Sequence, residues 1–530
     1  MAQTKKDNRE IIFDKDARDA LLRGAKIMAD TVGLSYGPKG RNVIVEKSYG
    51  RPMVSRDGVT LSKEIYSEIR DENMGMQLLN EAAEATVKNV GDGTTATVVL
   101  AHNLIEQAHL KIAAGVNPME VKDTIIKDSY KLLDRIQELS KPVKKGQLEQ
   151  VATVSSGDPG FGKLIAEAVE KVGSEGGIIT QKSPIADVDR TDVEGYYIEP
   201  GYTALTSGKI ELSDVYVVVS AKRITTGAEV IKLISKAVTG RYWAERGIKV
   251  GTPIQEPLNI FFYGEFDGDA YETINANVSQ SKFLGAIVKS PLQGGDMSSQ
   301  YLEDLAIYTG GRLITSADKL EELDYSCVGK ADKARISGKE AILFDSGGSQ
   351  EDIDQHIATL KGRIEKEEID AIAEKLKERV SKLEGKIAVF RIGGANQTQQ
   401  EEREFRIDDA IEATKAATKG GVVAGAGTSL VELSKCDVSE LWINALRNTY
   451  KKLLQNAALE PEVKLNEVFN SKYPQGFNLR GEAELVDVIA TGILDPTLVV
   501  TNIVKNAAAT AGDAVSVGAV ITFTDTEEQK

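Results

Sequence analysis

The stretch NVGDGTTATVVLAH, residues 89–102, decides the fold prediction. Gly91 and Gly93 allow a close backbone approach to a ligand, and the helix predicted to follow offers free N–H groups and its positive dipole end. Thr94 and Thr95 add hydroxyl donors. Asp92 would repel a phosphate, so its presence favours a bridging Mg²⁺ that also takes phosphate oxygens. The pentapeptide GDGTT is therefore compatible with a phosphate site. In the alternative interpretation, its glycines have no ligand and simply end one helix and begin the next.

Helical sequence with glycine-rich turns surrounds this stretch. Apolar residues from Asp14 onward recur at three- and four-residue spacing, which predicts an amphipathic helix that ends near Gly33. The predicted elements of the first 115 residues are helices at 14–33, 73–89 and 95–115, a turn at 37–40 and a hairpin of 42–47 with 51–57.

The middle of the chain has a different pattern. Pro142 and the glycine-rich sequence SSGDPGFG, 155–162, interrupt the helical periodicity and predict a domain boundary. Residues 196–345 then alternate β-type runs with helical stretches, which is typical of an α/β unit. The predicted strands there are VYVVVS, NIFFYG, FLGAIVKS, GRLITS and EAILF.

Two antiparallel helices are predicted between 353 and 383, with Ser349 as the first cap. Their many Glu and Lys residues indicate a solvated face more than a binding surface. From residue 406 onward the sequence again has helical periodicity interrupted by glycines. Since such sequence both opens and closes the chain, we expect a middle domain inserted into an outer one.

Composition limits the possible functions. The 530 residues carry 65 Lys and Arg against 80 Asp and Glu, a net charge of -15, which makes nucleic acid an improbable primary partner. Cys327 and Cys436 fit neither a disulfide framework nor a CxxC metal site, so buried inert thiols in a reducing cytoplasm are expected. The charged N-terminus does not resemble a signal peptide, and no apolar run approaches the roughly 20 residues of a membrane span. Length alone excludes a single small binding module.

Other candidate sites are weak. Gly157 to Lys163 matches the first seven positions of a P-loop, but Leu164 stands where Ser or Thr must bind Mg²⁺, so a helix start after a turn is the better interpretation. No metal-site pattern surrounds the three histidines, which are expected to be ordinary surface or core residues. These are His102, His109 and His356.

Seven motifs together resemble the GroEL-type (group I) chaperonin family, as in a divergent bacterial member. They keep the family's order and spacing over nearly the whole chain. The motifs are GPKGRNV at 37–43, RDGVT at 56–60, ENMG at 72–75, GDGTT at 91–95, AAGVNPM at 113–119, GVVAGAG at 421–427 and GILDPT at 492–497.

The resemblance implies a multidomain α/β fold with three nested domains. A mostly helical equatorial ATP-binding domain would comprise 1–138 and 420–530, and a small α/β intermediate hinge domain would comprise 139–194 and 387–419. An α/β apical domain, 195–386, would bind clients and a co-chaperonin. The resemblance further implies two stacked seven-membered rings, a GroES-type lid, and an ATPase of the protein-folding isomerase class that uses Mg²⁺ and K⁺.

Carried over by position, the resemblance assigns catalytic roles to Asp57, near the γ-phosphate, and to Asp409, which would position the attacking water when the intermediate domain swings down. Asp92 would bind Mg²⁺. Nucleotide contacts would come from Ser35, Tyr36, Gly37, Pro38, Arg56, Asp92, Gly93, Thr94, Thr95, Ala96, Gly425, Ala426, Asn478, Leu479 and Asp495. Client contacts would come from Tyr202, Val230, Ile231, Ile234, Tyr271 and Ile274.

Several residues depart from the family pattern. Tyr36 replaces a leucine, Ala96 replaces a threonine, and Ala426 interrupts a triple glycine, where backbone contacts survive if its φ is negative. Leu479 and Arg480 replace two small residues beside the expected adenine pocket. In the apical region Thr206, Ser207 and Asn275 stand where apolar residues are expected, RYWAERGIKVGTPIQ at 241–255 has no counterpart, and the Gly-Met-rich tail is missing.

Three functions remain open from the sequence. The first is an ATP-driven folding chaperonin, and the second is a nucleotide-responsive holdase or scaffold without encapsulation, suggested by the polar apical changes. The third, a small-molecule phosphotransferase, draws only on residues 157–163. The whole-chain resemblance favours the first.

Overall fold

The computed structural model describes residues 9–47, 52–144, 146–173, 176–183, 187–198, 210–289, 296–336, 341–367 and 370–523. The chain folds as two compact units. The first comprises Met1–Glu170, Thr180–Asp189 and Arg391–Lys530, and the second comprises Lys171–Ile179 and Arg190–Phe390. The three nested domains and their boundaries stay a prediction.

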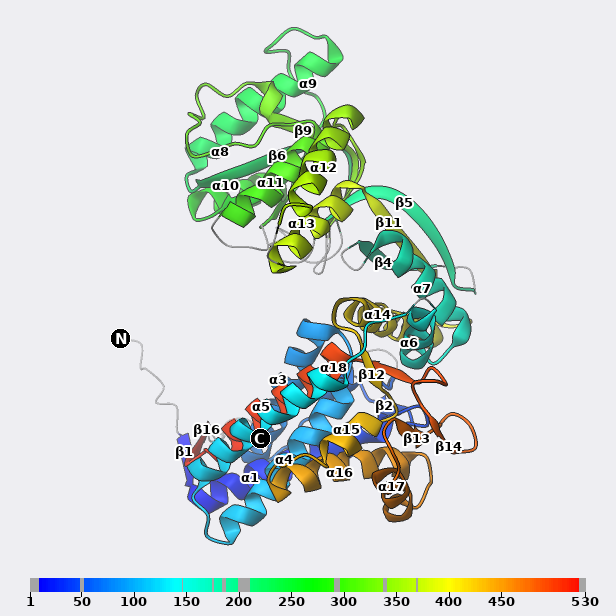
Figure 1. Ribbon diagram of the computed structural model, residues 1–530. Helices are drawn as coiled ribbons and strands as arrows, with labels where there is room; N and C mark the ends of the chain where they lie inside the picture. Colours follow the sequence, from blue (N-terminus) through cyan, green and yellow to red (C-terminus); the bar gives the residue numbers. More distant parts are fainter. Residues whose placement is uncertain are drawn as a thin grey trace, which may run out of the picture. The chain divides into compact units, whose positions relative to one another are not determined.

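The first unit is mostly helical and takes its elements from both ends of the chain (Figure 1). Its elements are β1 (Arg9–Phe13), α1 (Asp14–Val32), η1 (Gly33–Ser35), β2 (Val43–Val45), β3 (Met53–Ser55), α2 (Gly58–Glu64), α3 (Arg70–Val90), α4 (Thr94–Ala113), α5 (Pro118–Leu139), α6 (Gln147–Ser156), α7 (Pro159–Val172), α14 (Gln397–Gly420), β12 (Val422–Ala424), α15 (Thr428–Leu433), α16 (Glu440–Asn456), α17 (Pro461–Asn470), β13 (Gln475–Phe477), β14 (Leu485–Asp487), β15 (Leu494–Pro496), α18 (Thr497–Val515) and β16 (Ala519–Phe523).

Helix α4 lies at the centre of this unit. It contacts α1, α3, α16 and α18, and its residues are apolar on nearly every side. Val98, Leu100 and Leu104 are fully buried in the main core cluster, together with Ala507 of α18. A helix that is apolar all round is stable only when neighbouring helices cover it, so this burial fixes the position of its N-terminus at Thr94.

The second unit is built on a sheet with helices, and residues 180–182 of β4, 189 of β5 and 391–392 of β11 belong to the first unit. Its elements are β4 (Gly177–Lys182), β5 (Asp189–Ile198), β6 (Ile210–Ile224), α8 (Gly227–Leu233), a π-helical turn (Ile234–Val238), α9 (Thr239–Arg246), β7 (Leu258–Phe266), α10 (Asp269–Ser279), β8 (Phe283–Val288), α11 (Asp296–Thr309), η3 (Tyr325–Cys327), β9 (Val328–Ile336), β10 (Ala341–Ser346), α12 (Gln350–Ile364), α13 (Asp370–Leu383) and β11 (Lys386–Ile392).

The sheet has the strand order β4-β11-β5-β10-β9-β6-β7-β8. Strands β6, β7 and β8 run parallel, and β9 is antiparallel to β6. Along β6, Val215, Val217 and Val219 pack in the cluster that includes α11, α12 and α13, whereas Tyr216 and Val218 pack in the cluster that includes α8 and α10. Because successive side chains of a strand point to opposite faces, the apolar run VYVVV is buried on both sides.

Most predicted elements are confirmed. The helix from Asp14 is α1, the hairpin is β2 with β3, and Ser349 caps α12 by accepting a hydrogen bond from the Asp352 amide. Lys163 lies in α7, so the P-loop-like segment is the start of a helix.

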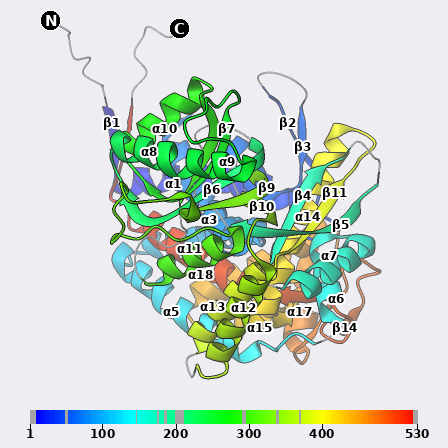
Figure 2. The ribbon, with the colours of Figure 1, turned by 90° about the horizontal axis from the view of Figure 1, so that it is seen from above.

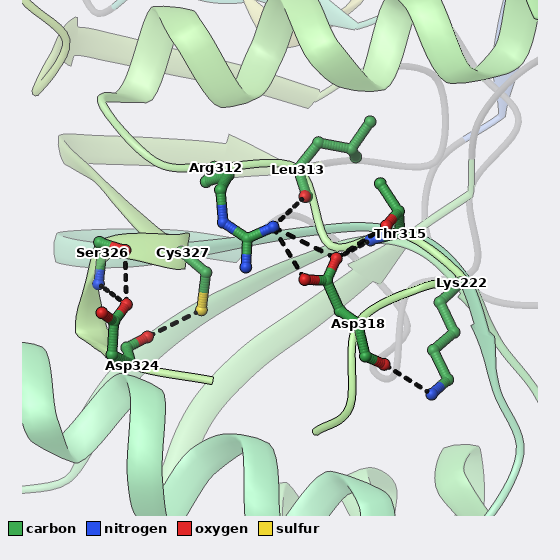
Figure 3. Close-up of polar contacts among 8 residues, drawn as sticks. All are labelled: Lys222, Arg312, Leu313, Thr315, Asp318, Asp324, Ser326 and Cys327. Carbon is green, nitrogen blue, oxygen red and sulfur yellow. Dashed lines mark hydrogen bonds and ion pairs between the residues drawn. The ribbon is translucent and has the colours of Figure 1, made fainter. Parts of the chain in front are cut away.

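The predicted strand GRLITS, 311–316, is wrong. Only Ile314 makes a β-bridge there, with Ser220. The Asp318 carboxylate accepts hydrogen bonds from the Thr315 amide (2.7 Å) and hydroxyl (2.8 Å), and Arg312 donates to the same carboxylate (Figure 3). These side-chain contacts turn the backbone after Ile314 and end its extended conformation.

Two small two-stranded sheets of the first unit expose apolar side chains. Strand β1 pairs antiparallel with β16, and this ribbon exposes Ile11, Phe13, Ile521 and Phe523. The β2–β3 hairpin (Figure 2) exposes Ile44, whose relative accessibility is 71%. Two-stranded ribbons are marginally stable on their own, so exposed apolar residues on both make them candidates for contacts with other chains.

No helix in the described parts of the chain is both long enough and apolar enough to cross a membrane.

Candidate functional site

The GDGTT loop joins α3 to α4 in a conformation that requires its glycines. Gly91 and Gly93 have φ angles of +70° and +88°. A Cβ atom on Gly91 would lie 2.2 Å from the Glu412 Cβ, and one on Gly93 would lie 2.7 Å from Val499 Cγ1. The loop therefore combines left-handed backbone with close packing, which only glycine allows. It places Asp92 beside the exposed N–H groups at the start of α4.

A cavity of about 540 Å³ opens at the N-terminus of α4 within the first unit. Sixteen of the predicted site residues line it: Ser35, Tyr36, Gly37, Pro38, Arg56, Asp57, Asp92, Gly93, Thr94, Thr95, Ala96, Asp409, Ala426, Asn478, Leu479 and Asp495. Gly425 does not line it; its amide donates to the Ile493 carbonyl (2.9 Å), and a Cβ atom on it would lie 3.0 Å from Asp495 Oδ1. Segments that are hundreds of residues apart in the sequence thus meet at one site.

Asp57 is held by the helix that follows it. Its carboxylate caps α2 by accepting hydrogen bonds from the Val59 amide (3.3 Å) and the Thr60 amide (2.8 Å), and it also accepts from the Thr60 hydroxyl. The next residue, Gly58, packs against Thr94 and Thr95 so closely that a Cβ atom would lie 2.6 Å from the Thr95 hydroxyl. The α2 cap is therefore fixed directly on the start of α4.

Asp92 is partly buried in the cavity wall. Its carboxylate accepts hydrogen bonds from the Gly93 amide (2.6 Å) and from the Ser155 hydroxyl (3.1 Å) of α6. Burial raises the pKa of Asp92, and the Asp57 charge raises it further, while the two hydrogen bonds oppose the shift. An ionised Asp92 would thus be stabilised by a cation.

Asp409 and Asp495 bring two further partly buried carboxyls to the cavity. Helix α14 supplies Asp409, and burial together with the charges of Asp92 and Asp57 raises the pKa of Asp409 well above its usual range. Burial and then Asp92 raise the pKa of Asp495 to about 7. Carboxyls that repel one another in this way are stabilised as carboxylates only when positive charge enters between them.

The residues present fit a Mg²⁺ ion whose remaining ligands come from a bound molecule. Among the described residues, no three His, Cys, Asp or Glu side chains are arranged to hold a metal by themselves. Mg²⁺ is typically bound by one or two protein carboxylates, phosphate oxygens and water. Asp92, with its raised pKa and its position beside the N-terminus of α4, matches that donor set.

Arginines face the cavity as well. Arg56 Nη2 donates to the Gly37 carbonyl (3.1 Å), and the pKa of Arg56 is lowered by burial and by the charge of Arg406. Arg406 and Arg480 line the same cavity. Positive groups beside an unpaired helix N-terminus attract an anion with several charged oxygens, such as a polyphosphate.

The sequence did not identify several residues of this site. Ser155, which binds Asp92, lies in SSGDPGFG, a segment interpreted as a domain boundary and the start of a helix. Arg406 lies at the start of the motif that contains Asp409, so a search of that motif for cations could have found it. Helices α6 and α14 also supply Val154, Ser156, Glu402 and Phe405, and Gly157 follows α6.

Other polar groups lie apart from the cavity. His102 is buried in α4, His109 pairs with Asp19 (3.2 Å) and His356 pairs with Asp304 (2.7 Å). A second cavity of about 720 Å³, lined by Lys144, Glu170 and other residues near the start of α6, contains none of the predicted site residues.

The buried thiol of Cys327 donates to the Asp324 carbonyl (3.0 Å; Figure 3), and burial raises its pKa to about 11. Burial also raises the pKa of the Cys436 thiol. Both thiols are therefore largely protonated and unreactive near neutral pH.

The predicted client-binding residues are only partly at the surface of the second unit. Val230 and Ile274 are 1% and 0% exposed and belong to the core under the sheet, so their assignment to a client surface is wrong. They occupy the sides of α8 and α10 that face the sheet. Ile231 is 60% exposed, and Ile234 and Tyr271 are half-buried. Tyr202, Thr206 and Ser207 lie outside the described residues.

Comparisons with known proteins agree with this architecture. The sequence model of the TCP-1/cpn60 chaperonin family matches residues 28–230 and 292–524. The gap, 231–291, contains α9 and the whole segment 241–255 for which the sequence showed no counterpart. The chaperonin gp146 from the bacteriophage EL 2 (Pseudomonas aeruginosa), crystallised in the presence of ATP-BeFx, has the same fold.

The likeness to that protein extends over 97% of this chain and 99% of the other chain, at 20% sequence identity, with TM-scores of 0.76 and 0.68 for two crystal forms. At this identity the likeness shows the fold alone. The match of the family model, by contrast, covers most of the sequence and includes all the segments that form the cavity. The chain belongs to the TCP-1/cpn60 chaperonin family.

Proposed function

We propose that this chain is an ATP-dependent molecular chaperone that hydrolyses ATP at the α4 cavity and uses the resulting domain movements to promote folding of non-native proteins. The observation that carries the proposal is the convergence of Asp57, Asp92 and Asp409 at the N-terminus of α4. Family membership and the fold shared with a chaperonin crystallised with ATP-BeFx support it.

The residues around α4 would bind the triphosphate. The free N–H groups of Thr94 and Thr95 and their hydroxyls offer donors to phosphate oxygens, and the helix dipole favours the negative charge. Arg56, which follows β3, would add a positive charge beside the phosphates. Asp495 and Asn478 would contact the ribose and the base.

Asp92 would hold Mg²⁺, and a bound Mg²⁺ would neutralise charge on the phosphates. The identity of a monovalent ion, K⁺, is proposed from the family resemblance. Both ions would relieve the repulsion among the partly buried carboxyls that raises their pKa values.

Asp409 would orient the attacking water and accept its proton. A carboxylate whose pKa is raised by burial is a better proton acceptor near neutral pH than an exposed one. In the structure α14 already brings Asp409 to the cavity. We propose that the segment that contains α14 can swing, so that Asp409 reaches the cavity in only one conformation and hydrolysis is gated by this movement.

The chaperone would act as an oligomeric ring in the cytoplasm, with non-native proteins bound at the exposed apolar residues of the second unit. Two stacked seven-membered rings, a closed folding cavity and a GroES-type lid follow from the family resemblance and belong to the proposal. Ile231, supported by Ile234 and Tyr271, is the proposed contact for clients.

A holdase or scaffold without encapsulation is the second candidate. The burial of Val230 and Ile274 favours it, because each apolar residue removed from the client surface forfeits about 1 to 2 kcal/mol of possible burial. Electron microscopy with ATP and a co-chaperonin distinguishes the two, since a closed, lidded cavity would exclude the holdase.

The variant Asp409→Ala tests the proposed ATPase. It should bind ATP but turn it over at a rate lower by about 10² or more, since it loses the group that orients water. Asp408→Ala is a matched control, because Asp408 accepts a hydrogen bond from Thr180 (3.0 Å) and does not line the cavity. Wild-type rings that hydrolyse ATP without raising the refolding yield of any denatured protein would contradict the chaperone function.

A further inference from the structure

Three residues that line the α4 cavity, Arg480, Asp92 and Arg406, contact the last turn of α6. Arg480 Nη2 donates hydrogen bonds to the carbonyls of Thr153 (2.9 Å) and Val154 (2.7 Å). The Ser155 hydroxyl donates to Asp92 (3.1 Å), and Arg406 Nε donates to the Ser156 carbonyl. Each of the four consecutive residues 153–156 therefore has a side-chain or backbone contact with another segment of the site.

The two arginines donate to carbonyls of the last turn of α6, where the Thr153 carbonyl also accepts a hydrogen bond from the Gly157 amide (3.0 Å). The last four carbonyls of an α-helix have no partner within it, and they carry the negative end of the helix dipole. A guanidinium offers several donors in a fixed plane, so it can hold two successive carbonyls at once. Arg480 does so for α6 through its Nη2 group, in addition to the helix's own C-cap at Gly157.

The backbone that carries Arg480 is itself fixed. The Asn478 side chain accepts hydrogen bonds from the Arg480 amide (3.2 Å) and the Gly481 amide (3.4 Å), which forms a tight turn after β13. Leu479 between them is 2% exposed and packs in the cluster that contains Tyr450 and Leu453. The guanidinium therefore extends from a rigid base, with Asn478 and Leu479 in the cavity wall.

From these contacts we propose that Arg480 is a positioning residue for the ATPase reaction. It holds the last turn of α6 against the segment 477–481. That turn carries Ser155, which binds Asp92, and it also accepts a hydrogen bond from Arg406 of α14, the helix that supplies Asp409. Arg480 thus links the proposed base-binding turn to the groups that bind metal and orient water. This inference rests on the proposed ATPase function.

The variants Arg480→Ala and Arg480→Lys test the clamp in the full-length assembled protein. Arg480→Ala should lower kcat for ATP hydrolysis by about tenfold and change KM by less than about twofold, since misplaced reacting groups lose rate more than affinity. Arg480→Lys keeps the charge but carries it as an ammonium on a flexible stem, which holds the two carbonyls less rigidly than the planar guanidinium, so it should restore kcat only in part.

Hydrogen exchange of the peptide 147–157 is the second measurement. Arg480→Ala should speed exchange there, whereas Lys131→Ala should leave both exchange and kcat unchanged. Lys131 is a suitable control because it also donates to a backbone carbonyl, that of Asp437 (2.8 Å), in the same unit but away from the cavity.

Two results would overturn the proposal. Unchanged kcat and unchanged exchange in Arg480→Ala would show that the clamp has no role, and a raised KM with unchanged kcat would show a direct nucleotide contact instead. If the wild-type protein itself bound no ATP, the proposed function would fail, and this outcome is distinct from a wild-type ATPase that is indifferent to Arg480.

Discussion

Ala426 adopts a left-handed backbone conformation, with a φ of +53°, in the loop between β12 and α15. The sequence-based expectation that backbone contacts survive an alanine here required a negative φ, so that condition is not met. Left-handed backbone costs a non-glycine residue about 1 to 2 kcal/mol. Because Ala426 lines the α4 cavity, this strain is located at the site itself.

The variant Ala426→Gly should therefore be more stable. Relief of the strain outweighs the greater entropy of glycine in the unfolded chain, and the expected net gain is about 0.5 to 1 kcal/mol, seen as a higher apparent melting temperature. Ala424→Gly is the control, since Ala424 is fully buried in β12 and pairs with Leu494. It should destabilise, and an equal response of both variants would contradict the strain at Ala426.

Asp495 predicts a pH dependence of stability. Its pKa is about 7 in the folded protein and near 3.8 when unfolded, so between these pH values the folded state binds the extra proton. Stability therefore falls as pH rises from about 4 to 7, and the loss is complete above pH 7. Asp92 and Asp409, whose pKa values are also raised, contribute in the same direction.

Asp495→Asn should remove the contribution of this carboxyl. The variant should match the wild type near pH 4 and exceed its stability by about 1 to 3 kcal/mol at pH 8, measured by urea unfolding without nucleotide. A constant difference between the two proteins across this range would show that Asp495 does not titrate as proposed.

At the scale of elements, the spacing of apolar residues correctly predicted the helices and the hairpin whose formation depends on local sequence. Helices α1, α3, α4, α12 and α13 and the β2–β3 hairpin lie where the apolar spacing placed them. The prediction failed at GRLITS, where a side chain competes with strand pairing, and at Val230 and Ile274, whose exposure depends on how α8 and α10 pack on the sheet. Contacts such as Ser155 with Asp92 and Arg480 with Val154 join residues 63 and 326 positions apart, which no local pattern encodes.

Helices α11, α12 and α13 are joined by a buried ionic group. Arg379 of α13 is 1% exposed and donates to both carboxylate oxygens of Asp304 in α11 (2.7 and 2.8 Å), and His356 of α12 contacts the same carboxylate (2.7 Å). Removing one partner would leave a buried charge poorly compensated, which typically costs about 3 to 5 kcal/mol.

Arg379→Met should accordingly loosen this layer. Hydrogen exchange of α12 and α13 should accelerate by at least about tenfold, because opening of the layer becomes less costly. Arg363→Met, an exposed arginine of α12, is the control and should leave exchange unchanged. The double variant Arg379→Met, Asp304→Leu should recover part of the protection, and a failure to do so would point to lost packing instead of an uncompensated charge.

At the scale of the whole molecule, we assign two of the sets of exposed apolar residues to different partners. Ile44 on the β2–β3 hairpin and Ile521 on the β1–β16 ribbon are 71% and 53% exposed on small sheets of the first unit, which we assign to contacts between chains. Ile231 on α8 is exposed on the second unit and is the proposed client contact. Substitution by Asp should separate the two roles.

Ile44→Asp should prevent ring assembly while leaving the isolated chain folded, because a charge in an apolar interface loses about 1 to 2 kcal/mol of burial at each repeated contact and also costs desolvation. Mass photometry and sedimentation velocity would measure this loss, and circular dichroism would check the fold. Ile231→Asp should keep full rings and ATP turnover but capture less denatured protein. If Ile44→Asp formed intact rings, the hairpin would not be an assembly contact; if Ile231→Asp bound clients as the wild type does, the client surface would lie elsewhere on the second unit.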